Sequence, residues 1–148
     1  ARDVSDLFST IDINQLNITS SAMKVNSQYM HSLRFCIEVE GHVSTDDVLK
    51  LMSDDRFVTL THHKTSNRIF SFGRDHGFYG RIYNQVVVSI PSLTTIKGKD
   101  STRILGFAFT PQDGNSILSS VAACLYSLHD NDYEKYLSHI TSMLQDFV

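Results

Sequence analysis

A chain of 148 residues has the usual size of one domain, and at this length folding buries about 70% of the unfolded surface. Hydrophobic residues make up 41% and charged residues 20%, as in an ordinary globular protein. The net charge of −3, without a cluster of lysines and arginines, argues against nucleic acid and anionic membranes as partners. The longest apolar runs are far too short to span a bilayer.

The first third of the chain predicts two strands after an irregular start. Residues 4–13 are expected to be irregular, and residues 17–25 favour a strand. Residues 32–40 form the clearest strand, because apolar and polar side chains alternate there with the period of two that is typical of a half-buried antiparallel strand. The apolar positions are Leu33, Phe35, Ile37 and Val39.

A helix is expected next, with Ser44 as its N-cap. Asp46 and Asp47 fall in the first turn, where the helix dipole favours acidic side chains, and Asp47 has the spacing to close a capping box. Its predicted buried face consists of Val48, Leu49, Leu51 and Met52.

The remaining elements complete an α+β pattern. Residues 57–61 predict a short strand, residues 66–75 a helix, and residues 81–90 and 102–110 two strands that end at prolines. Two amphipathic helices follow. Their apolar stripes are Ile117, Val121, Leu125 and Leu128 in the first, and Tyr133, Leu137, Ile140, Leu144 and Phe147 in the second. This order is not a strict βαβ alternation, so we expect a mostly antiparallel sheet with helices on one face.

Familiar cofactor and metal motifs are missing from this sequence. It holds no G-x-G-x-x-G after a strand, no phosphate-loop pattern and no spaced Cys/His quartet, so we expect no metal site and no Rossmann domain within residues 1–148. Because the chain begins at Ala1 rather than Met, we expect a single domain or fragment of a longer protein. Cys36 and Cys124 lie far apart, which favours free thiols and a cytoplasmic location, while a single bridge between them stays open as the alternative. We expect Cys36 to be partly exposed and Cys124 to lie in the core.

Among the histidines, His31 is the best candidate for chemistry. It lies where the irregular stretch 26–28 enters the strand at 32–40, and strand ends next to loops often carry functional groups. Imidazole is the side chain best matched to proton transfer near neutral pH. A purely structural role for His31 stays open, and the adjacent His62 and His63 are expected to be structural or solvent-exposed.

Several segments taken together resemble one enzyme family. The first segment, residues 16–52, begins with L-N-I-T-S-S-A-M-K-V and continues through His31 to a helix that carries D-D-V near its start. The next two are F-G-R-D at positions 72–75 and Y-N-Q-V-V-V at positions 83–88. The last is Gln112-Asp113, which precedes a C-terminal helix. In this order, from about residue 16 to residue 125, they are similar to the second half of the catalytic domain of archaeal-type glyceraldehyde-3-phosphate dehydrogenases. The resemblance implies the antiparallel α+β fold of that domain.

The resemblance also implies a function. The family's catalytic histidine falls on His31, which would take the proton from a catalytic cysteine upstream and assist hydride transfer, and Gln112 and Asp113 would lie near the nicotinamide of NAD or NADP. The chain would then be part of an NAD(P)-dependent aldehyde-oxidising enzyme, inactive and without bound cofactor as this fragment alone. Residues 32–40 and 81–90 would form a homo-oligomer interface through the sheet.

Two other readings remain open. The family's P-T-T and P-E-N motifs are replaced at residues 26–28 and 118–120, which favours a divergent module that kept the fold for oligomerisation or ligand binding and lost the chemistry. The other alternative is that the resemblance is accidental and that the chain is an unrelated α+β domain. A parallel central sheet, or the absence of the C-terminal helix pair, would favour that last reading.

Overall fold

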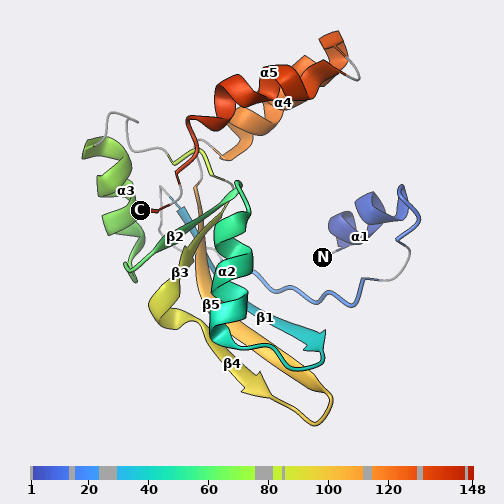
Figure 1. Ribbon diagram of the computed structural model, residues 1–148, viewed down its shortest axis with the longest axis vertical. Coiled ribbons are helices and arrows are strands. Elements are labelled where there is room, and N and C mark those ends of the chain that lie inside the picture. Colours follow the sequence, from blue (N-terminus) through green and yellow to red (C-terminus); the bar gives the residue numbers. More distant parts are fainter. Residues whose placement is uncertain are drawn as a thin grey trace.

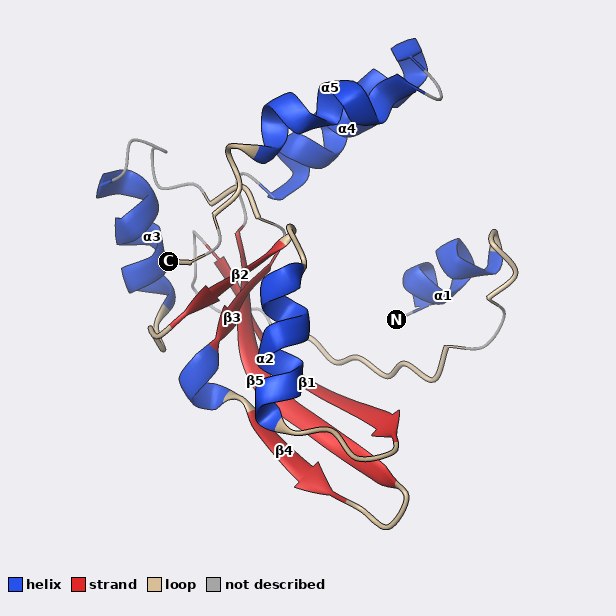
Figure 2. Ribbon diagram, in the orientation of Figure 1, coloured by secondary structure: helices blue, strands red, loops and turns tan. Residues whose placement is uncertain are grey.

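The computed structural model describes residues 2–13, 16–23, 30–75, 82–84, 86–111, 115–129, 132–145 and 147–148. These residues form an α+β structure around a five-stranded sheet with the strand order β1-β5-β3-β2, in which β4 also pairs with β5 (Figures 1 and 2). The strands are β1 (Met30–Glu40), β2 (Val58–Thr61), β3 (Val86–Ser89), β4 (Thr94–Lys97) and β5 (Ser101–Pro111). The clearest predicted strand is β1, and the prediction at 102–110 is confirmed by β5, whereas β4 was not expected.

The sheet is mixed rather than purely antiparallel. Strand β5 runs antiparallel to β1, β3 and β4, but β2 and β3 are parallel to each other. A parallel pair needs a long crossover connection, and helix α3 (Ser66–Asp75) lies within the connection between β2 and β3. The predicted β-rich run 81–90 contains β3 and then ends in the short 3₁₀ helix η1 (Ile90–Ser92).

The other helices are α1 (Arg2–Ser9), α2 (Thr45–Asp54), α4 (Asn115–His129) and α5 (Tyr133–Thr141). Helices α2, α3, α4 and α5 confirm the predictions, but two expectations near the N-terminus are wrong. Val4, Leu7 and Phe8 follow the spacing of a helix face, and α1 forms where an irregular segment was expected. Residues 16–23 are irregular rather than a strand, because no described strand pairs with them.

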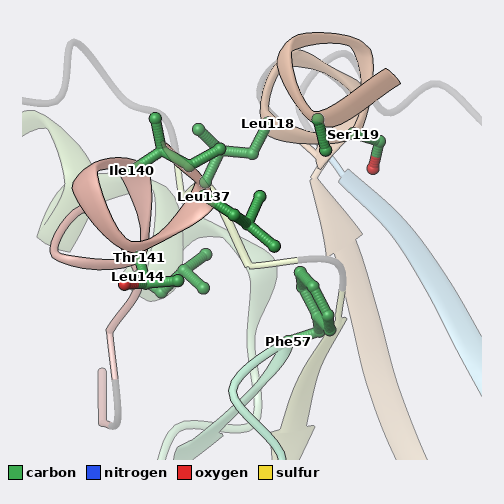
Figure 3. Close-up of a pocket in the computed structure, with 8 residues that line it drawn as sticks. Phe57, Leu118, Ser119, Leu137, Ile140, Thr141 and Leu144 are labelled. Carbon is green, nitrogen blue, oxygen red and sulfur yellow. The ribbon is translucent and has the colours of Figure 1, made fainter. Parts of the chain in front are cut away.

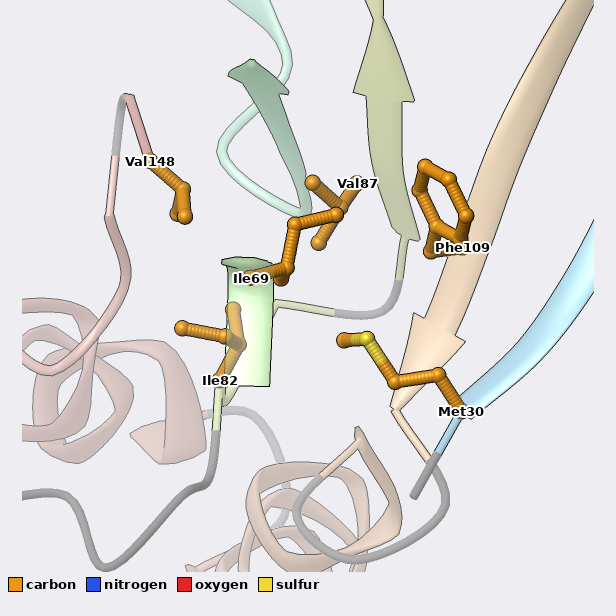
Figure 4. Close-up of a cluster of buried hydrophobic side chains, with 6 residues drawn as sticks. All are labelled: Met30, Ile69, Ile82, Val87, Phe109 and Val148. Atoms are coloured by element: carbon orange, nitrogen blue, oxygen red, sulfur yellow. The ribbon is translucent and has the colours of Figure 1, made fainter. Parts of the chain in front are cut away.

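The sheet is covered on both faces, so the expectation of helices on one face is wrong. Side chains that are paired across a ladder share a face, and successive residues along a strand point to opposite faces. Val87 pairs with Phe109, and both belong to a cluster with Ile69 of α3: Met30, Ile69, Ile82, Val87, Phe109 and Val148 (Figure 4). Ile104 of β5 points to the other face, where it packs in a cluster with Val48 of α2.

Helix α2 forms because its first turn is fully capped. The Asp47 N–H donates to Ser44 Oγ at 3.1 Å, and the Ser44 N–H donates to Asp47 Oδ2 at 2.9 Å, so the predicted capping box is present. Its sheet-facing side is formed by Val48, Leu49 and Met52. Leu51 was expected on that side but is 73% exposed, because the sheet covers the side of the helix that carries Leu49.

The C-terminal segment is tied to the sheet through one buried amide. Asn84 is fully buried, its Nδ2 donates to the carbonyl oxygens of Gln145 (2.9 Å) and Arg56 (3.3 Å), and its Oδ1 accepts the Gln145 N–H at 2.8 Å. The Val148 N–H then donates to the Leu60 carbonyl of β2. A buried amide with every one of these bonds made fixes the chain end firmly, since losing a partner would leave a polar group unpaired.

Helices α4 and α5 pack on each other and present part of their apolar surface to solvent. Leu118 and Leu137 are buried, but Ile117, Val121 and Leu128 of the expected buried stripe are exposed. Phe147 of the second stripe is also exposed. Within the described residues, none of the helices combines the length and the apolar character that crossing a membrane requires.

Candidate functional site

His31 stands at one end of the longest ladder in the sheet. It is the second residue of β1 and pairs with Thr110 near the end of β5, while Met30 pairs with Pro111. The residue after Pro111 in the chain is Gln112. Gln112 and Asp113 themselves lie outside the described residues, so of the three expected site residues the structure describes His31 alone.

The surroundings of His31 leave its imidazole open to solvent. By the alternation of the strand it points to the same face as Leu33 and Phe35, and its side chain is exposed. No described residue makes a hydrogen bond or ion pair with it. Within the described residues, no partner therefore fixes which of its ring nitrogens carries the proton.

Two other segments of the resemblance have structural roles here. Phe72 packs against the cluster around Ile69, and Arg74 Nε lies 2.8 Å from Asp75 Oδ1 at the end of α3. The Asp75 carboxylate raises the pKa of the Arg74 guanidinium, although both side chains are largely exposed. Asn84, from the Y-N-Q-V-V-V segment, is buried, and its side chain hydrogen-bonds to the backbone of Gln145 in the C-terminal segment instead of reaching solvent.

An apolar cavity of 220 Å³ lies between the helix pair and the sheet (Figure 3). Its lining consists of Phe57, Leu118, Ser119, Ala122, Leu137, Ile140, Thr141 and Leu144. The Thr141 hydroxyl already donates to the Ser138 carbonyl at 2.8 Å. None of the described residues that line this cavity is ionisable, so they supply no group for acid–base chemistry.

A larger cavity of 480 Å³ opens on the face of the sheet that is opposite to His31. Its lining consists of Ser32, Lys64, Ser89, Pro91, Ser92, Phe107 and Phe109. The buried Ser89 hydroxyl donates to the His63 carbonyl at 2.9 Å, and Ser92 Oγ accepts the Phe107 N–H at 2.8 Å. Among the described residues, Lys64 is the single ionisable side chain in this lining. Sequence patterns did not single out this cavity, although Lys64 follows the end of β2 and Pro91 and Ser92 follow the end of β3.

The two thiols and the histidine pair form no site of their own. Cys36 is exposed, as expected, but Cys124 is also exposed, so its assignment to the core is wrong; both thiols are free. Cys124 is exposed because it lies beside the apolar stripe of α4, and that side of the helix faces solvent. The His62 ring lies 5.2 Å from the Phe147 ring. Among the described residues, no group of three or more metal-binding side chains is close enough together to hold an ion.

Comparisons of the chain with protein-family models, with curated proteins and with solved structures give no significant match.

Proposed function

We propose that this chain is the C-terminal portion of a glyceraldehyde-3-phosphate-dehydrogenase-like oxidoreductase and belongs to its catalytic domain. The complete protein oxidises an aldehyde through a thioester on an upstream cysteine and passes the hydride to NAD or NADP. In this proposal His31 takes the proton of that cysteine, and Gln112 and Asp113 lie near the nicotinamide. The chain alone is inactive, because it contains neither the nucleophile nor the nucleotide-binding domain.

The register of β1 and β5 is the observation that carries the proposal. Residues 31 and 112 are far apart in sequence, and the resemblance assigns both to one site. The pairing of His31 with Thr110 and of Met30 with Pro111 brings His31 to the end of the ladder from which the chain continues to Gln112. A parallel pairing of β1 with β5 would have placed the start of β1 and the end of β5 at opposite ends of the ladder.

Two features of the fold also support the proposal over an unrelated α+β domain. The central strand β5 is antiparallel to each of its described neighbours, and the C-terminal helix pair is present. The parallel pairing of β2 with β3 lies at the edge of the sheet and does not involve β5.

The test uses the protein that the complete reading frame encodes. It should reduce NAD or NADP when glyceraldehyde 3-phosphate is supplied, and iodoacetamide should abolish this activity by alkylating the upstream cysteine. The exposed Cys36 and Cys124 serve as matched controls. Cys36→Ser and Cys124→Ser should leave both the turnover and its sensitivity to iodoacetamide unchanged.

Two results would contradict the proposal. One is a complete protein that reduces neither cofactor with this aldehyde or with other short phosphorylated aldehydes. The other is turnover that survives full alkylation of the accessible thiols, because a thioester mechanism needs a free thiolate.

A second candidate function is an oligomerisation module without chemistry, and the exposed side of β1 favours it. Leu33 and Ile37 are 44% and 46% exposed on the apolar face of the strand. Strand β1 is also at the edge of the sheet, so one row of its backbone groups has no described strand beside it. An edge strand of 11 residues with exposed apolar side chains is a suitable template for pairing with a second copy.

Sedimentation of the 148-residue chain tests this second function. Two results together would favour the non-catalytic module. The chain sediments as an oligomer that Ile37→Glu converts to a monomer, and the complete protein has no dehydrogenase activity. Leu51→Glu is the control, because Leu51 is exposed on α2 rather than on the strand. A monomer at all concentrations would exclude oligomerisation through β1.

A further inference from the structure

We propose that the 480 Å³ cavity on the face of the sheet opposite to His31 binds a small organic anion with an apolar body, such as an aryl or alkyl phosphate or carboxylate. The inference does not depend on the proposed dehydrogenase function. Ser32 lines the cavity, and the adjacent His31 points to the other face of the strand. The cavity is therefore a site separate from the candidate catalytic residue.

The cavity lies at the carboxyl ends of the two parallel strands. Strands β2 and β3 are the parallel pair of this sheet, and they end at Thr61 and Ser89. Ser89 is the last residue of β3, and Lys64 follows the last residue of β2 by three positions. Both residues line the cavity. The space outside the carboxyl ends of parallel strands is where open sheets with crossover helices bind their ligands, because the connecting loops diverge there and leave a crevice.

The floor of the cavity suits an apolar group. Phe107 and Phe109 are two residues apart on β5 and therefore point to the same face. Phe109 is buried in the core, whereas Phe107 is 48% exposed and presents its ring to the cavity. A hydrocarbon body placed against Phe107 removes this ring from water and gains free energy in proportion to the apolar area that becomes covered.

The charge around the cavity selects an anion. Lys64 lines it, and no carboxylate of the described residues does, although the chain as a whole carries a net charge of −3. Arg34 pairs with Phe107 in the ladder and so points to the same face, one pair further along from Ser32 and Phe109. Among the described residues, neither Lys64 nor Arg34 makes an ion pair. Two cations without acidic partners, beside an exposed aromatic ring, complement an anionic head on an apolar body.

The hydroxyls of Ser89 and Ser92 already donate to acceptors within the protein. Ser89 and Ser92 use their hydrogens on the carbonyl oxygens of His63 and Ser89, at 2.9 and 2.7 Å. Neither hydroxyl therefore donates into the cavity, and the proposal places the anionic head at the Lys64 ammonium. The apolar body then lies over Phe107.

Titration with phenyl phosphate, followed through the backbone amide signals of the ¹⁵N-labelled chain, tests the proposal. Saturable shifts are expected at Lys64, Ser89, Ser92 and Phe107, and benzyl alcohol, which has the ring without the charge, should bind more weakly. Lys64→Gln should weaken phenyl phosphate binding about fivefold, the effect of losing one partly solvated ion pair. Binding of benzyl alcohol should be unchanged in this variant.

Lys50→Gln is the matched control, since Lys50 is an exposed lysine of α2 on the other side of the sheet. Three outcomes would overturn the proposal. The first is the absence of saturable shifts at these amides, and the second is an equal affinity for Lys64→Gln and Lys50→Gln. The third is a set of shifts centred on Phe57 and Leu137, which would place the ligand in the other cavity.

Discussion

The sheet with α2 and the C-terminal helix pair α4–α5 contain similar shares of apolar residues but use them differently. Around β5, apolar side chains from both faces are buried, with Ile69, Val87 and Ile104 at most 7% exposed. On α4, Ile117, Val121 and Leu128 remain exposed, and Leu118 alone of that helix's described leucines and isoleucines is buried. The difference indicates that the sheet is well packed around Ile69, Val87 and Ile104, whereas the helix pair presents an apolar surface that the described residues do not cover.

The largest expected effect separates these two regions directly. Ile69→Ala removes a side chain that is 0% exposed and should lower the free energy of unfolding by about 3 kcal/mol, because the lost transfer energy and the remaining cavity add together. Leu128→Ala removes a side chain that is 76% exposed and should change it by less than about 0.5 kcal/mol. Urea denaturation of both variants measures the contrast. Equal losses would show that the helix pair is as well packed as the sheet.

A smaller effect tests how tightly the α2 face is packed. A Cβ atom at Gly106 would lie 2.6 Å from Phe35 Cζ and 3.2 Å from Leu93 Cδ1, so Gly106→Ala forces the Phe35 ring to move. We expect a loss of about 2 kcal/mol from this overpacking, measured by denaturation. Combining the substitution with Phe35→Leu should recover part of that loss. A neutral single variant would mean that this face of the sheet is loosely filled.

The smallest effect concerns the capping of α2. Ser44→Ala removes the acceptor of the Asp47 N–H and should cost about 1 kcal/mol, whereas Ser53→Ala, on an exposed hydroxyl of the same helix, should cost far less. Thermal unfolding compares the two variants. Equal melting temperatures for Ser44→Ala and Ser53→Ala would contradict the role of the capping box.

The capping box also makes a prediction about pH. The hydrogen bonds from Ser44 lower the pKa of the Asp47 carboxyl from its ordinary value of 3.8. A carboxyl with a lowered pKa in the folded state adds stability above pH 3.8 and loses it as the pH falls through the folded-state pKa. Asp47→Asn should therefore reduce stability at pH 6 and have little effect at the lowest pH where the chain folds.

Local sequence patterns were sufficient to predict the elements that depend on neighbouring residues alone. The alternation at residues 32–40 predicted β1, and Ser44 with Asp47 predicted the start of α2, because both depend on neighbouring residues. The stripe on α4 gave the helix correctly but not its burial, since periodicity identifies an apolar face and not what covers it. Similarly, Leu51 and Cys124 were assigned to the interior although both are exposed.

Long-range pairing was beyond the sequence patterns. Nothing local indicates that β2 pairs in parallel with β3, or that Asn84 reaches Gln145 across 61 positions. The cavity lined by Lys64 and Phe107 depends on this pairing and could not be found from spacing. The candidate catalytic residue was a different case, because His31 was selected by its chemistry and its position at a strand start, and the register of β1 with β5 then gave its surroundings.

The rate of hydride transfer in a single turnover of the complete protein, compared between His31→Asn and His42→Asn, tests the central claim most directly. His42 is an exposed histidine just beyond the far end of β1 and serves as the matched control. If His31 is the general base, its replacement should slow hydride transfer about 10²- to 10⁴-fold, and His42→Asn should leave the rate unchanged. Equal rates in the two variants would contradict the assignment of His31.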